Sequence, residues 1–121
     1  MTTKAKLLKL ADFLEQKVKD SWFDLGTWGD KGFPKKECGA TACAAGWATV
    51  CFPRSGLTLL PNSYVEGLEI AYRRGDSGRY TRGFAAVMAF FEIDREAAEH
   101  LFDHVYYIFN PGHVILFRRL V

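Results

Sequence analysis

The feature that most constrains the fold is a run of small apolar residues in the first half of the chain. Residues 37–48 contain five alanines, two glycines and two cysteines around one tryptophan. Apolar residues recur there at helical spacing on one side, and the opposite side is also small and apolar, which is typical of a helix buried on most sides. We therefore predict a central buried helix over residues 39–52, which ends before Pro53 because proline has no backbone N–H.

Three further stretches predict helices around this centre. Residues 3–19 show an amphipathic pattern with a stripe of leucines, and a threonine at the start can cap the helix. The charged side chains of this helix are expected on a solvated face. Residues 82–91 are apolar at helical spacing, and Asp94 can cap a short helix that runs to about Phe102.

The sheet content is expected to be small. Residues 67–73 alternate between apolar and polar side chains, which permits a strand, with residues 75–78 as a turn and residues 79–81 returning. A helix over residues 64–73 is the alternative. Residues 53–66 hold two prolines and are expected to be irregular. The predicted fold is α+β and predominantly α: a compact helical domain around the central helix, with at most a small β-hairpin.

Length and composition place limits on the class of protein. A chain of 121 residues that is 49% hydrophobic predicts a single domain over residues 1–121. The net charge of +2 gives little electrostatic reason to expect nucleic acid as the partner. Three cysteines, an odd number, predict reduced thiols and a cytoplasmic protein, and no apolar run is long enough for a membrane span. No cofactor is indicated, the oligomeric state is left open, and residues 111–121 permit either a helix or a strand.

The start of the central helix is the first candidate binding region. Cys38 is placed at or just before the predicted helix N-terminus, where the helix dipole lowers a thiol pKa and unpaired N–H groups favour anions. The alternative is that Cys38 and Cys43 are small buried hydrophobic residues. The preceding loop is rich in aromatic residues and either walls a ligand site or covers the core. The candidate ligand-binding residues, which share a place in this region or near the predicted turn, are Trp28, Cys38, Gly39, Thr41, Arg79 and Arg82.

Arginines gather around the predicted turn in the second half of the chain. The four residues are Arg73, Arg74, Arg79 and Arg82. Arginine forks pair well with phosphates and carboxylates, so the group could hold a phosphate or an acidic partner, and nucleic acid is a further hypothesis. The alternative is a set of solvated hairpin charges.

A metal site is a further alternative. Glu96, His100 and His104 follow one another at intervals of four residues. If the helix continued to His104, the three side chains would share one face and could bind a divalent metal. An exposed polar edge explains the same spacing without a metal, and no known metal-binding motif is present.

Two segments carry a resemblance to a known family. Trp28–Asp30 and Cys38–Ala48 resemble a family of small uncharacterised bacterial and phage proteins, which carry a Cys-Gly-Thr-x-x-Cys-x-Ala-Gly-Trp-Ala core. In that family an amphipathic helix and an aromatic loop come first, and an Ala-rich segment comes later, matched here by Ala97–Phe102. This sequence has Ala40 where threonine is common, with Thr41 following. The resemblance implies no particular activity.

A second resemblance is to papain-like cysteine hydrolases, in which a Cys-Gly pair opens the central helix and a distant histidine begins a strand. Cys38, Gly39 and His113 match those parts, and the resemblance implies thiolate attack by Cys38 with His113 as base. The sequence departs from the pattern because no glutamine or asparagine shortly before Cys38 could build an oxyanion hole. Its one glutamine, Gln16, is far from Cys38. Only eight residues follow His113, and none is Asp, Asn or Glu.

These observations favour a small non-enzymatic binding module, and the first resemblance implies a phage or bacterial protein. Such a module would sequester a small anionic, nucleotide-like ligand or mask a protein partner. The alternative is a cysteine hydrolase that uses Cys38 and His113. The incomplete catalytic set and the aromatic loop favour the binding module.

Overall fold

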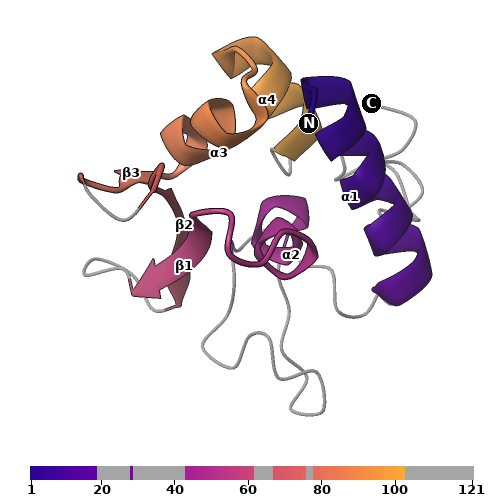
Figure 1. The fold of residues 1–121 in the computed structure, drawn as a ribbon, viewed down its shortest axis with the longest axis horizontal. Coiled ribbons are helices and arrows are strands. Elements are labelled where there is room, and N and C mark those ends of the chain that lie inside the picture. Colours follow the sequence, from indigo (N-terminus) through magenta and orange to yellow (C-terminus); the bar gives the residue numbers. More distant parts are fainter. Residues whose placement is uncertain (19–27, 29–42, 62–66, 76–77, 103–121) are drawn as a thin grey trace.

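The computed structural model describes residues 1–18, 28, 43–61, 67–75 and 78–102. These residues form four helices and a three-stranded antiparallel sheet in the order β1-β2-β3 (Figure 1). The predicted α+β fold, predominantly α, is confirmed. The elements in chain order are α1 (Thr3–Lys17), α2 (Ala44–Cys51), β1 (Leu57–Pro61), β2 (Leu68–Tyr72), β3 (Thr81–Arg82), α3 (Phe84–Phe91) and α4 (Arg95–Phe102).

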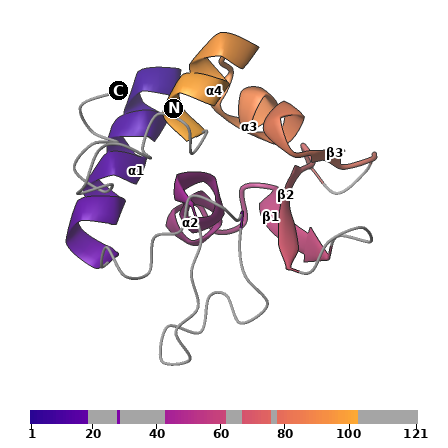
Figure 2. The same cartoon turned by 180° about the vertical axis from the view of Figure 1, so that it is seen from behind.

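Helix α2 is the predicted central helix. Figures 1 and 2, seen from opposite sides, both show it between α1 and the sheet. Ala44 to Ala48 are all buried, and Trp47 is fully enclosed. The helix ends at Cys51, two residues before Pro53, as expected. It begins at Ala44 rather than at residue 39, because the backbone of Cys43 is extended and this residue is the N-cap.

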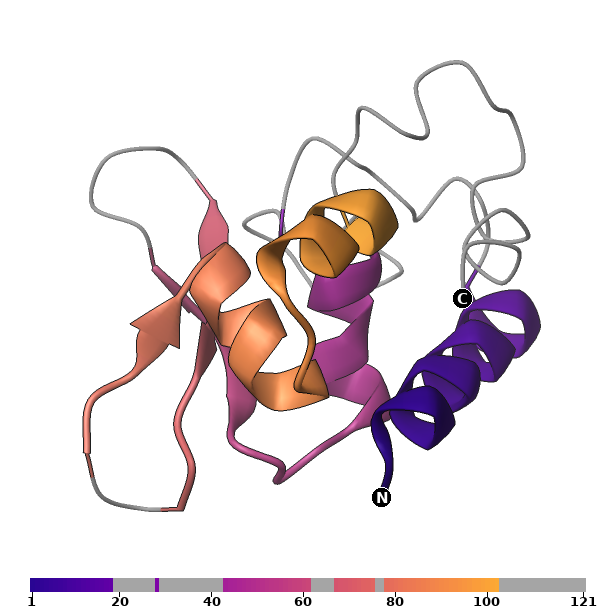
Figure 3. The ribbon, with the colours of Figure 1, turned by 90° about the horizontal axis from the view of Figure 1, so that it is seen from above.

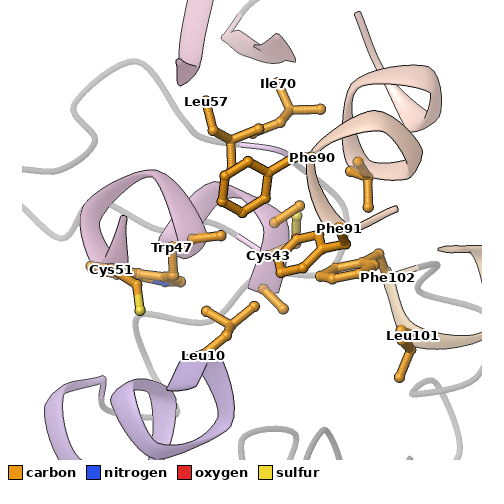
Figure 4. Close-up of a cluster of buried hydrophobic side chains, with 14 of the residues drawn as sticks. Leu10, Cys43, Trp47, Cys51, Leu57, Ile70, Phe90, Phe91, Leu101 and Phe102 are labelled. Atoms are coloured by element: carbon orange, nitrogen blue, oxygen red, sulfur yellow. The ribbon is translucent and has the colours of Figure 1, made fainter. Parts of the chain in front are cut away.

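The core is built from aromatic and aliphatic side chains on either side of α2. Figure 4 shows Leu10 of α1 on one side of Trp47 and Phe90 of α3 on the other, near Leu57. The ring of Phe90 also meets that of Phe91 edge to face, with the centroids 4.8 Å apart. Full burial of a large apolar side chain contributes roughly 1.5–3 kcal/mol, so this cluster accounts for much of the stability.

Helix α1 follows its amphipathic pattern. The N–H of Ala5 donates to Oγ1 of Thr2 at 3.1 Å, so a threonine caps the helix as predicted. The helix ends at Lys17, and Val18 is extended and buried. The expected apolar stripe is confirmed by the side chains that the helix buries: Leu7, Leu10, Ala11 and Leu14.

The sheet is one strand larger than the predicted hairpin. The strand over 68–72 is confirmed, and the alternative helix is wrong for those residues. The prediction that residues 53–66 are irregular is wrong for Leu57–Pro61, which pair with β2 along their whole length. Proline is tolerated here because Pro61 is the last residue of an edge strand, where a missing N–H costs little.

The second half of the chain closes the fold with two short helices. Helix α3 packs against β2 and α4. It ends at Phe91, and the C-cap residue Glu92 adopts a left-handed conformation. The N–H of Ala97 then donates to Oδ1 of Asp94 at 2.8 Å, which confirms the predicted cap of α4.

Candidate functional site

The loop that joins β2 to β3 carries three arginines among its described residues: Arg73, Arg74 and Arg79. Tyr72 pairs with Thr81 as the last residue of β2, and the two legs of the loop continue from this pair. On the legs, the guanidinium of Arg73 stands 4.7 Å from the centre of the Tyr80 ring. This cation–π contact joins the legs one residue beyond the last strand pairing.

A close backbone approach brings a third segment to the same place. The N–H of Arg73 donates to the carbonyl oxygen of Gly56 at 3.1 Å. Gly56 has a φ of +93°, and a Cβ at this position would clash with the carbonyl oxygen of Arg73. Only glycine suits both conditions. The turn between α2 and β1, which includes Arg54, is therefore held against the start of the loop. Figure 3 shows this turn and both legs of the loop at the same end of the sheet.

Four arginines share this region, which we call the arginine end of the sheet: Arg54, Arg73, Arg74 and Arg79. Arg54, Arg74 and Arg79 are exposed, and Arg73 is half-buried. Within the part of the chain that the structure describes, no carboxylate forms an ion pair with any of the four. The sequence places one acidic residue in this loop, Asp76, which lies outside the described residues.

Arg82 differs from this group, although the sequence placed it in the same cluster. Its guanidinium donates to Oε1 of Glu69 at 3.2 Å and to the carbonyl oxygen of Pro61 at 3.4 Å. Pro61 is the far end of β1 from Arg54, so Arg82 reaches along the sheet away from the arginine end. Glu69 already forms an ion pair with Arg82. Of the two arginines predicted to bind a ligand, Arg79 and Arg82, Arg79 is therefore the more available.

Sequence reasoning missed two members of this site. Arg54 is far from the other arginines in the sequence, and only the contact between Gly56 and Arg73 brings it near them. Tyr80 was read as part of a returning strand, and its ring contact with Arg73 depends on the register of the hairpin. For Arg54, the one local signal in the sequence was a nearby glycine, Gly56. For Tyr80, the sequence held no such signal.

Trp28 packs on the body of the protein, as expected for its aromatic loop. Its ring meets that of Phe84 edge to face, with the centroids 5.2 Å apart. The guanidinium of Arg95 stands 5.7 Å from the centre of the Phe84 ring. Trp28 is half-buried against the start of α3, so this contact supports a covering role for Trp28.

The two cysteines in the described part of the chain are buried. Cys43 is 3% exposed and Cys51 is 7% exposed, which fits the interpretation of Cys43 as a small hydrophobic residue. Burial raises the pKa of the Cys51 thiol to about 11, against the opposing effect of the Lys9 charge. Cys43, rather than Cys38, is the N-cap of α2. Cys38 lies outside the described residues, so the predicted effect of the helix dipole on its thiol stays a prediction.

The alternative metal site is only partly covered by the described residues. Glu96 and His100 lie on α4 and line an open depression of about 430 Å³ together with Asp94 and Ala97. Oδ1 of Asp94 already accepts the hydrogen bond from the N–H of Ala97 that caps α4. Among the described residues, no three His, Cys, Asp or Glu side chains come close enough together to hold a metal ion. His104 lies outside those residues.

Several predicted site residues also lie outside the described residues: Cys38, Gly39, Thr41 and His113. Their proposed roles in anion binding or in hydrolysis therefore stay predictions.

Comparison with protein-family models, with curated proteins and with solved structures finds no match for this chain. The resemblances noted from the sequence therefore stay predictions. No helix in the described ranges has both the length and the apolar character that a membrane crossing needs.

Proposed function

We propose that this protein is a non-enzymatic binding module that captures an anionic ligand at the arginine end of the sheet. The observation that carries the proposal is the gathering of Arg54, Arg73, Arg74 and Arg79 from two separate segments, with no described carboxylate paired to any of them.

The chemistry of arginine supports an anionic ligand. Each guanidinium presents several N–H donors in a planar fork that matches a carboxylate or phosphate, and such charge-assisted bonds are stronger than neutral ones. A single exposed ion pair contributes little, on the order of 0–1 kcal/mol. Several arginines that bind one multiply charged group contribute more. The ligand loses its translational and rotational freedom only once, whatever the number of arginines that it contacts.

The placement of like charges on the two legs of the loop supports the same conclusion. Arg74 and Arg79 stand on opposite legs of one loop, each one residue nearer the tip than the contact between Arg73 and Tyr80. Like charges on facing legs repel each other and destabilise the loop, and a bound anion reverses this effect. Because arginine stays protonated throughout the ordinary pH range, the group supplies fixed positive charge and not an acid or a base. This favours binding over catalysis.

The proposal is tested by calorimetric titration with inorganic tripolyphosphate at low and at moderate salt. We expect measurable binding that weakens with salt, and a loss of affinity of at least tenfold in the double variant Arg74→Gln/Arg79→Gln. The matched control is Lys4→Gln/Lys17→Gln, which removes the same charge from exposed positions on α1 and should change the affinity less than twofold. No binding by the natural protein, or equal losses in both double variants, would overturn the proposal.

A further inference from the structure

The cation–π pair of Arg73 and Tyr80, which we call the flat pair because both groups are planar, adds a surface for stacking to the arginine end. The guanidinium carbon of Arg73 is 4.7 Å from the ring centroid, and both side chains are half-buried, so each is partly covered and partly accessible. Nucleobases stack on aromatic rings and on arginine planes alike.

We infer that the ligand of the arginine end is a mononucleotide, whose base stacks on the Arg73–Tyr80 pair and whose phosphates are held by Arg74 and Arg79. The inference rests on the proposed function and narrows it from anions in general to one class of ligand. It uses two kinds of group at one place: a flat pair for a base, and cations with no carboxylate partner among the described residues for the phosphates.

The order of these groups along the loop fits the order of groups in a nucleotide. The flat pair lies next to the sheet, directly after the pairing of Tyr72 with Thr81. Arg74 and Arg79 follow one residue further out on each leg, and the backbone bends at Arg74. The side chains of both residues are long and exposed, so they can turn toward the phosphates of a nucleotide whose base lies on the flat pair.

Arg54 adds positive charge from the second segment of the site. It is exposed, and its turn is held to Arg73 by the hydrogen bond between Arg73 and Gly56. Its charge adds to the field at the base of the loop, whereas Arg82 is directed to Glu69 and Pro61 and does not contribute in the same way. The ligand thus meets positive charge from both segments of the site.

The experiment compares a nucleoside triphosphate with inorganic tripolyphosphate on the full chain, without divalent metal and at equal ionic strength. We expect the nucleotide to bind at least tenfold more tightly although tripolyphosphate carries the greater charge, since stacking of one base contributes about 1–3 kcal/mol. In Tyr80→Leu this preference should fall below threefold, while tripolyphosphate binding stays within threefold of the natural protein. Tyr80→Phe keeps the ring and should keep the preference, which separates loss of stacking from loss of folding.

The outcomes distinguish this inference from the proposed function. Equal binding of the two compounds by the natural protein would overturn the inference that the ligand is a nucleotide, and would leave the proposal of anion binding in place. A preference that survives in a folded Tyr80→Leu variant would overturn the role of the flat pair. Binding of neither compound would overturn both proposals. A short single-stranded oligonucleotide that bound far more tightly than the mononucleotide would overturn the assignment of a small ligand.

Discussion

The ammonium group of Lys6 donates to the carbonyl oxygen of Phe90 at 2.6 Å and stands 4.6 Å from the centre of the ring of the same residue. Phe90 lies in the last turn of α3, where backbone carbonyls lack partners within the helix. A cation is favourable at this end of a helix dipole. One lysine of α1 therefore fastens α1 to α3, although the sequence predicted that the charges of this helix would face solvent.

Replacing Lys6 with methionine should destabilise the protein by about 1–3 kcal/mol. Methionine keeps the aliphatic contacts of the side chain but removes the charged donor, and it leaves a partly buried carbonyl without a partner. Urea unfolding followed by circular dichroism measures the change. Lys4→Met, at an exposed position on the same helix, is the control and should stay within about 0.5 kcal/mol. Equal changes in both variants would show that the Lys6 contact adds nothing to stability.

Gly56→Ala should destabilise the protein more than Gly78→Ala. Both glycines have nearly the same positive φ, +93° and +95°, so the conformational strain of alanine, about 1–2 kcal/mol, is common to both. Only at Gly56 does the new Cβ meet backbone, the carbonyl oxygen of Arg73, whereas nothing lies within 4 Å at Gly78. The excess, measured by urea unfolding, reports the cost of moving the turn away from the loop. No excess would mean that the two segments separate easily.

The helices could be predicted because their signals are local. The run of small residues around Trp47 and the cap at Asp94 act within a few residues, so spacing and capping rules locate α2 and α4. The start of α2 was placed too early, because Cys43 is as apolar as the residues that follow it and no capping side chain marks the boundary. Strand β1 was missed because the prolines of residues 53–66 suggested irregular structure, although its pairing partner β2 begins only seven residues after Pro61.

The candidate site was predicted only in part, because its members come from two separate segments of the chain. Arg74 and Arg79 stood out as neighbours in the sequence, and the structure leaves both exposed. Arg54 joins them through a backbone hydrogen bond over a long sequence separation, which no local pattern encodes. Arg82 looked equivalent to Arg79, but the strand register sets it beside Glu69. Whether an arginine side chain is available to a ligand thus depends on the strand pairing, which local sequence patterns do not encode.

Asp94→Ala should destabilise the protein by about 1 kcal/mol, with a range of roughly 0.5–2 kcal/mol. The N–H of Ala97 donates to the Asp94 carboxylate at 2.8 Å, and alanine would leave this donor without a side-chain partner. Asp94→Asn is the matched control, because the amide oxygen accepts the same bond, and it should retain most of the stability. If both variants lost the same amount, the negative charge and not the cap bond would be the source of the effect.

The Cys51 thiol should make stability fall between about pH 9 and pH 11. Burial raises its pKa from 9.0 to about 11, so below pH 9 the thiol is protonated in both folded and unfolded chains and has no effect. Between the two values the unfolded chain loses the proton and the folded chain keeps it, which favours unfolding, and the effect levels off above about pH 11. Urea unfolding of the natural protein and of Cys51→Ala, measured across this range, isolates the contribution because every other titrating group is common to both. The stability of the natural protein relative to Cys51→Ala should decrease as the pH rises, whereas a constant difference would mean that the folded protein leaves this sulfur open to solvent.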